Sequence, residues 1–200
     1  MKAVFLEGLD GCGKTTFINH LKSARPDFIF SREPGGLGLS QKVRELVLSD
    51  DAEQADPLTM FNLFWASRAE NVAKIIRPAI TAGQVVISDR FDASTYAYQI
   101  GKNPDLEELF WHTREVCLRG VPCIYLDFKV SPAEATRRLK ARGGENHFDR
   151  RSEEDRRMTR VFYDKFFSRE GIVSIQVDAD VPEERMISVA LVALGHALDN

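Results

Sequence analysis

The sequence predicts an α/β fold in which a five-stranded parallel sheet carries helices on both faces. Two observations support this fold class. Short, almost continuously apolar runs recur along the 200 residues, and longer segments with helical spacing separate them. Strands that are apolar at every position are buried on both faces, which is typical of parallel sheets. Ligands of such sheets bind beyond the carboxyl ends of the strands.

The expected strands are short runs of apolar and β-branched side chains. In chain order they cover residues 3–6, 28–30, 84–88, 123–127 and 173–177. A glycine-rich segment follows the first strand at once. The next element is a helix over 14–21, because Phe17, Ile18 and Leu21 recur at helical spacing.

The composition indicates an ordinary globular chain, with 44% hydrophobic and 28% charged residues. A net charge of −3 does not indicate the positively charged surface that binds nucleic acid. No apolar run approaches the roughly 18–20 residues of a membrane helix, and the N-terminus lacks a signal-peptide pattern. Three cysteines without a C-x-x-C pair argue against a disulfide framework and against a zinc site. We therefore expect one cytoplasmic domain over 1–200 that binds neither nucleic acid nor membrane.

The strongest motif directly follows the first strand and matches the pattern G-x-x-x-x-G-K-[ST]. It consists of Gly8, Leu9, Asp10, Gly11, Cys12, Gly13, Lys14 and Thr15, and Thr16 comes next. Its glycines let backbone N–H groups turn toward a phosphate, and the following helix points its positive end at the same anion. Lys14 is expected to face solvent until it meets the β- and γ-phosphates, and Thr15 to bind Mg²⁺. Residues 8–16 are thus the predicted ATP-binding segment of a P-loop NTPase fold.

Polar residues after the second and third strands decide between the classes of P-loop protein. The chain has no N-K-x-D run, which a GTPase needs, and a motor would usually need a longer chain. Asp89 ends the third strand, where its carboxylate suits Mg²⁺, and the guanidinium of Arg90 suits a phosphate. A structural ion pair is the alternative reading of this dipeptide. Arg32 stands at the entrance of a Pro-Gly turn after the second strand, well placed for a second phosphate.

Residues 137–160 form a basic segment in an acidic chain, with nine Lys or Arg against five Asp or Glu. A solvated helix face is the plain interpretation of such a run. Gly143 and Gly144 interrupt the helical pattern, however, which favours a loop between two helices. An arginine-rich loop in a nucleotide enzyme is expected to act as a short lid.

These motifs together resemble the thymidylate (dTMP) kinases of the nucleoside monophosphate kinase group. The matching runs are 6–16, 32–36, 64–68, 89–91 and 94–99, with Arg142, Asp149 and Arg150. They span roughly residues 3 to 160, and the run from Asp89 to Gln99 is the most specific because other P-loop kinases do not share it. The resemblance implies that Mg²⁺ and ATP serve to phosphorylate dTMP to dTDP for dTTP synthesis, and it implies a homodimer.

Carried over by position, the resemblance also implies contacts with the acceptor nucleotide. Asp10 would lie near the 3′-hydroxyl of the sugar, and Arg32 and Arg90 would hold the acceptor phosphate. Base and sugar contacts would come from four further residues: Phe64 would stack on thymine, Arg68 would bind its edge, Thr95 would lie near the base, and Tyr98 would stand where a ribose 2′-hydroxyl protrudes.

Two positions depart from the family pattern. Leu37 replaces the usual Thr after the R-E-P-G-G run, and Gly11 stands where eukaryotic-type members carry a P-loop arginine. A catalytic arginine must then come from the lid, as in bacterial-type members, and Arg142 and Arg150 are the candidates. They join Lys14 and Arg90 as the predicted catalytic residues.

Two other functions stay open at this point. A deoxynucleoside kinase shares the sheet and the P-loop, but it needs a carboxylate base after the first strand and no clamp for an acceptor phosphate. A P-loop regulator would retain a nucleotide without transferring a phosphoryl group, and its basic segment would serve nucleic acid.

Overall fold

The computed structural model describes residues 2–143 and 151–199, and it contains the parallel sheet that the sequence predicts. The strands are β1 (Ala3–Glu7), β2 (Ile29–Arg32), β3 (Val86–Asp89), β4 (Cys123–Lys129) and β5 (Val173–Asp178). Their order is β2-β3-β1-β4-β5, and every neighbouring pair is parallel. Because β1 is central and entirely buried, the loop that follows it begins in the middle of the carboxyl edge.

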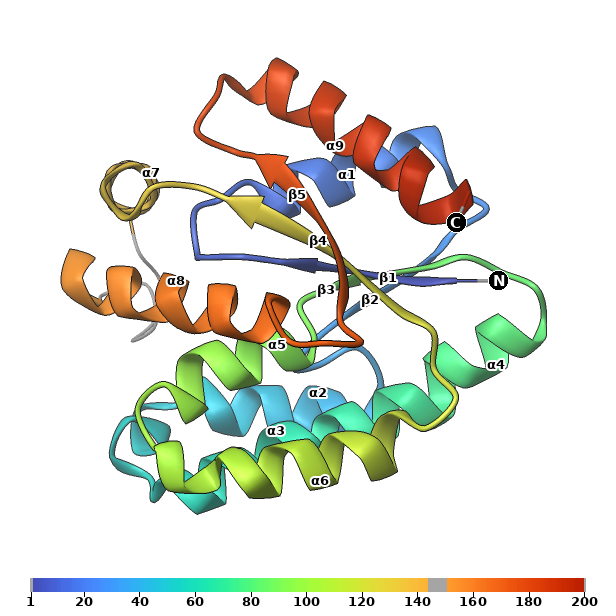
Figure 1. Cartoon of the computed structure of the whole chain (residues 1–200). Helices are drawn as coiled ribbons and strands as arrows, with labels where there is room; N and C mark the ends of the chain where they lie inside the picture. The colour runs from blue at the N-terminus through green and yellow to red at the C-terminus, as the bar shows by residue number, and fades with distance from the viewer. Residues whose placement is uncertain (1, 144–150, 200) are drawn as a thin grey trace.

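Helices cover both faces of the sheet, as predicted (Figure 1). Those with α-helical hydrogen bonding are α1 (Lys14–Ala24), α2 (Gly38–Val47), α3 (Pro57–Asn71), α4 (Arg77–Thr81), α5 (Asp92–Thr95), α6 (Glu107–Leu118), α7 (Pro132–Arg142), α8 (Glu153–Phe167) and α9 (Glu183–Asp199). Short 3₁₀ and π segments at Asp50–Gln54, Val72–Ile76, Tyr96–Ile100 and Pro104–Leu106 complete the chain order. Helices α1 and α9 lie on one face, whereas α2 to α6 lie on the other.

Local sequence signals start the helices that frame the carboxyl edge. Asp56 caps α3 by accepting hydrogen bonds from two backbone N–H groups, and Pro57 occupies the first turn. Ser152 and Asp155 form a reciprocal capping box at the start of α8. The start of α8 is therefore fixed within the basic segment 137–160.

The structure shifts several of the predicted boundaries. Strand β3 begins at Val86 and not at residue 84, and β1, β3, β4 and β5 each end one or two residues later than predicted. Strand β2 begins one residue later than expected and runs on to Arg32, because Phe28 closes a turn by donating its N–H to the carbonyl of Arg25. The basic segment 137–160 is largely helical, since α7 ends at Arg142 and α8 begins at Glu153. Residues 144–150 lie outside the described part of the chain, so the lid stays a prediction. Within 2–143 and 151–199, none of the helices has the length and apolar character that a membrane crossing requires.

Candidate active site

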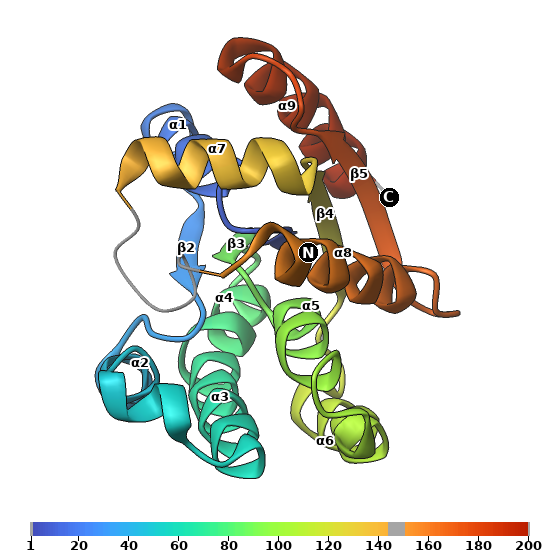
Figure 2. The same cartoon turned by 90° about the vertical axis from the view of Figure 1, so that its left-hand side faces the viewer.

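Two hollows meet beyond the carboxyl ends of the strands. The larger, the P-loop cleft, has a volume of about 940 Å³ and lies between the loop after β1, α7 and the segment before α9. The smaller, the α3 cavity, has a volume of about 310 Å³ and extends between α2, α3 and the turn after α5. Figure 2 looks onto this edge, with α1 and α7 on one side and α2, α3 and α5 on the other. Among the residues that the structure describes, four line both hollows: Asp10, Glu33, Arg44 and Arg90.

The P-loop has the backbone conformation that its glycines predict. Gly8 has a φ of 139°, and a Cβ there would lie 2.5 Å from the carbonyl oxygen of Phe128. Gly11 has a φ of 84°, and its Cβ would lie 2.9 Å from the carbonyl oxygen of Ala135 on α7. Side chains are therefore excluded from both positions by backbone atoms. The loop can pack this closely against β4 and α7 only with glycine.

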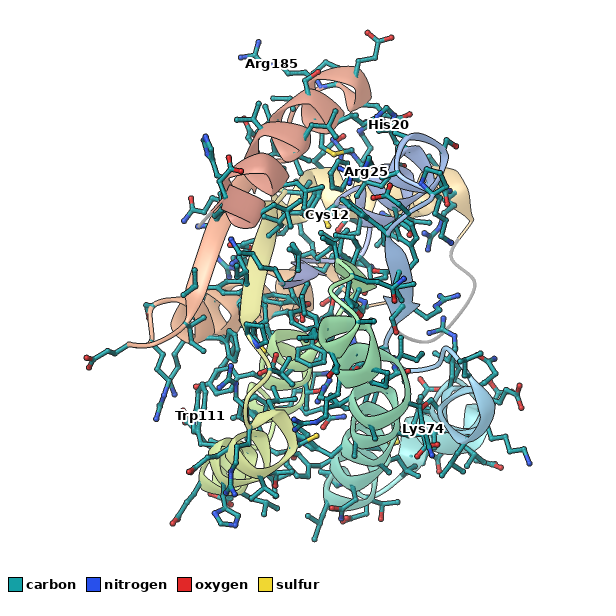
Figure 3. All side chains as sticks on the ribbon, turned by 90° about the vertical axis from the view of Figure 1, so that its right-hand side faces the viewer. Cys12, His20, Arg25, Lys74, Trp111 and Arg185 are labelled. Carbon is teal, nitrogen blue, oxygen red and sulfur yellow. The ribbon has the colours of Figure 1, made fainter. Side chains whose placement is uncertain are left out.

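Lys14 does not face solvent as expected. Its side chain is folded back over the loop, where Nζ donates hydrogen bonds of 3.0 Å to the carbonyl oxygens of Gly8 and Leu9. A third contact of 3.2 Å reaches the Sγ of Cys12, which is fully buried and lies well inside the molecular outline in Figure 3. The expectation failed because the curled loop presents its own carbonyl groups to the ammonium.

The two predicted metal ligands line the same cleft. Thr15 stands at the start of α1, and Asp89 ends β3. A hydroxyl and a carboxylate are hard oxygen donors of the kind that Mg²⁺ takes. Over the described ranges, no group of three or more His, Cys, Asp and Glu side chains is close enough to hold a metal ion. The donor set thus fits a cation that a nucleotide brings with its phosphates and water.

Arg90 lies at the junction of the two hollows and has a positive φ of 67°. Its NH1 donates hydrogen bonds to Ser94 Oγ at 2.9 Å and to Tyr163 OH at 3.3 Å, while NH2 donates to Asp10. Arg90 also forms a structural ion pair, as the alternative reading of the Asp89–Arg90 dipeptide expects, and its partner is Asp10 of the P-loop.

Glu7 holds this turn in place, and the sequence interpretation gave it no role. One carboxylate oxygen accepts hydrogen bonds from the backbone N–H of Phe91 (2.7 Å) and of Ser94 (3.0 Å), and the other accepts from Ser94 Oγ (2.5 Å). Burial raises the pKa of Glu7, and the hydrogen bonds from Ser94 oppose that rise. The sequence did contain a signal for this role: a carboxylate at the end of a buried strand needs hydrogen-bond partners, because burying it without them is costly.

Asp10 is bound on both of its oxygens by residues from the acceptor side. Tyr98 OH donates to Oδ2 at 2.9 Å, and Arg90 donates to Oδ1. Burial alone would raise the pKa of Asp10, but the positive charges of Arg90 and Lys14 lower it to about 2. The carboxylate is therefore ionised at neutral pH.

The four predicted base and sugar residues all line the α3 cavity: Phe64, Arg68, Thr95 and Tyr98. Arg68 is 1% exposed, and its Nε donates to Glu33 Oε2 at 2.8 Å. Its NH2 donates to the Phe91 carbonyl oxygen at 2.9 Å and to Thr95 Oγ1 at 3.0 Å. Burial raises the pKa of Glu33 to about 7, although the charge of Arg68 acts to lower it.

Three buried polar atoms of this cavity's lining residues have no hydrogen-bond partner in the part of the chain that the structure describes. They are Arg68 NH1, Glu33 Oε1 and Gln99 Oε1. A buried polar atom without a partner costs about 1–3 kcal/mol. Each of these three atoms belongs to a residue that lines the α3 cavity, and a partner from outside the described chain would relieve this cost.

The arginines predicted to bind phosphate or to belong to the lid do not all line the same hollow. Arg32 and Arg142 line the P-loop cleft. Arg150 lies outside the described residues. Its neighbour Arg151, which the sequence interpretation missed, lines the α3 cavity with its guanidinium 4.7 Å from the ring of Tyr98. Leu37 is 63% exposed and is not among the described lining residues of either hollow.

Two more arginines were missed. Arg44 donates to the Pro34 carbonyl oxygen at 2.9 Å and lines both hollows, and Arg138 donates to the Gly11 carbonyl oxygen at 3.4 Å. Burial lowers the pKa of Arg44, and the nearby charge of Arg32 lowers it further. Positive charge is thus concentrated where two anions would meet.

The comparisons with known proteins agree with this geometry. A family model described as "Thymidylate kinase" matches residues 6–187. The chain is 36% identical over 188 residues to a thymidylate kinase of Mesoplasma florum, covering 90% of this chain and 89% of that protein. It is 38% identical over 152 residues to a thymidylate kinase of Pseudomonas fluorescens, covering 73% of this chain and 72% of that protein. It is 40% identical over 147 residues to a thymidylate kinase of Synechococcus sp., covering 68% of this chain and 70% of that protein.

Proposed function

This chain belongs to the thymidylate kinase family, and we propose that it transfers the γ-phosphoryl group of ATP to the phosphate of dTMP, forming dTDP for dTTP synthesis. As a nucleoside monophosphate kinase, it needs a donor site and an acceptor site in contact. One observation carries the proposal: the P-loop cleft and the α3 cavity meet at a wall that both share.

On the donor side, residues 8–16 would bind ATP. Lys14 would leave the loop carbonyls for the β- and γ-phosphates, which offer it a stronger, charge-assisted contact. Thr15 and Asp89 would hold Mg²⁺, and the bound ion would neutralise charge on the phosphates. Arg142 lines the same cleft and would stabilise charge on the transferring group; Arg150 is the second candidate for that role.

On the acceptor side, the unpartnered atoms of the cavity match thymine. Arg68 NH1 would donate to the O4 oxygen, and Gln99 Oε1 would accept from N3–H. Cytosine has the opposite pattern on these two atoms, an amino donor and a bare nitrogen. Phe64 would stack on the base. Thr95 would help to orient Arg68, because its Oγ1 accepts a hydrogen bond from Arg68 NH2 at 3.0 Å.

The acceptor phosphate would lie at the shared wall. Arg32 and Arg90 would bind it, with Arg44 as a third cation, and Asp10 would lie near the 3′-hydroxyl. Tyr98 would close the space that a ribose 2′-hydroxyl needs. Because the acceptor phosphate is already ionised, its oxygen attacks in line without a general base, and catalysis rests on positioning and charge stabilisation.

Among the described residues that follow the first strand, no carboxylate is suited to be the base that the deoxynucleoside kinase alternative needs. Such an enzyme needs a free carboxylate after the first strand, whereas the oxygens of Glu7 accept from Phe91 and Ser94. Asp10 is held by Arg90 and Tyr98. The cluster of arginines at the wall favours an acceptor that already carries a phosphate. A nucleotide-retaining regulator would have no use for a second cavity lined by the predicted base residues.

A coupled assay of ADP release with a panel of acceptors tests the function. We expect the highest kcat/KM with dTMP, detectable turnover of dUMP and poor turnover of dCMP, UMP and thymidine. Thymidine as the best acceptor would establish the deoxynucleoside kinase instead. Nucleotide binding without turnover of any acceptor would establish the regulator.

We also propose that the chain is a single cytoplasmic domain with a lid at about 137–160 and forms a homodimer. An apolar groove of about 300 Å³ between α3 and α6, next to the 58% exposed Val116, supports dimerisation. Light scattering coupled to size exclusion would measure the mass in solution. A mass near the 22.6 kDa of one chain would contradict the dimer.

A further inference from the structure

Glu33 and Arg68 form a buried ion pair in the wall of the α3 cavity. Their Nε–Oε2 distance is 2.8 Å, and their side chains are 3% and 1% exposed, respectively. Glu33 directly follows β2, and Arg68 lies on α3, so the contact joins the sheet edge to the helix that forms the cavity wall.

Three of the contacts of Arg68 fix its guanidinium group in one orientation. Its Nε is held by Glu33, and its NH2 is held by the Phe91 carbonyl oxygen and by Thr95 Oγ1. The ring of Trp65 lies 4.5 Å from the guanidinium carbon. Only NH1 lacks a hydrogen-bond partner among residues 2–143 and 151–199. The direction in which Arg68 offers a donor is therefore set by its other contacts.

Glu33 is itself anchored to the sheet. Its backbone N–H donates to the carbonyl oxygen of Asp89 at 2.8 Å, which continues the β2–β3 pairing by one residue. A buried ion pair is weak evidence for stability, because desolvation of the two charges offsets their attraction. Here Glu33 Oε1 and Arg68 NH1 also lack partners within the described chain, which makes the pair costlier still. A stabilising role thus explains the pair poorly.

We propose that Glu33 is a positioning residue that sets the base selectivity of the enzyme by aiming Arg68 at the acceptor base. The inference rests on the proposed function, in which Arg68 NH1 donates to O4 of thymine. With Nε bound to Glu33, the guanidinium cannot swing away from the base, and because it carries only donors, a cytosine amino group always meets a donor there. Without Glu33, Nε loses its acceptor and the guanidinium gains freedom to turn.

Three substitutions at one position test this role. Glu33→Ala removes the acceptor, Glu33→Asp withdraws it by one methylene, and Glu33→Gln keeps an acceptor oxygen at the same reach. The measurement is the ratio of kcat/KM for dTMP to that for dCMP. We expect Ala and Asp to lower the ratio about 10-fold or more, and Gln to keep it within about 3-fold, because unpaired polar groups carry the discrimination.

The loss should lie mainly in KM for dTMP and less in kcat, because Glu33 holds Arg68 and does not contact the transferring group. Asp127→Ala is the matched control. It also breaks a buried carboxylate–arginine pair, Asp127 with Arg160 at 2.7 Å, but on β4 and α8. Its ratio should equal that of the wild type.

The outcomes separate the two proposals. A wild-type ratio in the Asp variant, or in a folded Ala variant, would overturn the role of Glu33. So would an equal loss in Asp127→Ala, since that would reveal a general effect of destabilisation. A wild-type enzyme that does not turn over dTMP would defeat the proposed function instead.

Discussion

Tyr98 donates its phenol hydrogen to Oδ2 of Asp10 at 2.9 Å, although the two residues stand 88 positions apart in the chain. The contact joins the π-helical turn Tyr96–Ile100 to the P-loop. Arg90 holds the other oxygen of Asp10. The P-loop is therefore positioned in part by residues of the acceptor side, and substitutions there should affect both substrates.

Tyr98→Phe should keep the selectivity against ribonucleotides, whereas Tyr98→Ala should lose it. The phenyl ring still fills the space of a 2′-hydroxyl, and it keeps the ring–ring packing with Tyr163 at 6.1 Å between centroids. We expect the preference for dTMP over its ribonucleotide to fall about 10-fold or more in the Ala variant and by less than about 3-fold in the Phe variant. Competition kinetics with both nucleotides measures it. Equal losses would show that the hydroxyl, not the ring, carries the selectivity.

Lys14→Met should lower kcat by about 10²-fold or more, because a charge contact to the transferring phosphoryl is lost. The fold should persist, since the long apolar side chain can occupy the space over the loop. Lys22→Met, on an exposed position of the same helix, is the control and should be nearly as active as the wild type. Retention of more than about a tenth of kcat by Lys14→Met would contradict the role of the P-loop lysine.

The lid arginines should have different kinetic effects. Arg142 lines the P-loop cleft and Arg151 the α3 cavity. Arg142→Ala should therefore mainly lower kcat, and Arg151→Ala should mainly raise KM for dTMP. Arg150→Ala, measured alongside, decides which of the two neighbours Arg150 and Arg151 the transfer needs. If all three variants keep the wild-type kcat, the charge is supplied by another residue.

The stability of the wild type should fall relative to Glu33→Gln as the pH rises from about 4.5 to about 7. Burial raises the pKa of Glu33 from 4.5 to about 7 in the folded chain, so the folded state keeps a proton that the unfolded state has lost. Stability falls with pH wherever the folded state binds more protons. The full effect is about 3 kcal/mol at most. Urea unfolding of both proteins across this range measures it, and parallel curves would contradict the raised pKa.

Features encoded by neighbouring residues were predictable from the sequence. Each strand follows from a local apolar run. The P-loop conformation follows from its glycines, because a side chain at Gly8 or Gly11 would collide with the carbonyl oxygen of Phe128 or Ala135. Phe64, Arg68 and Thr95 were predicted as base contacts from a family pattern, and the structure brings all three to one cavity, while their roles stay a prediction.

Contacts between distant residues were not predictable. Lys14 meets carbonyl groups that turn inward only once the loop is curled. The role of Glu7 depends on Ser94, 87 positions away, and Arg151 reaches Tyr98 only because the start of α8 is set beside the cavity. A sequence pattern specifies which side chains exist but not which backbone atoms they will face.

With ATP in one hollow and dTMP in the other, as proposed, the common wall predicts that binding of the two substrates is thermodynamically linked. Asp10, Glu33, Arg44 and Arg90 border both spaces, so a nucleotide in one changes the electrostatic potential and the side-chain freedom that the other meets. Such a coupling free energy is reciprocal: the factor by which ATP changes the affinity for dTMP equals the factor by which dTMP changes the affinity for ATP. We expect the same reciprocal coupling between the affinities for the products ADP and dTDP.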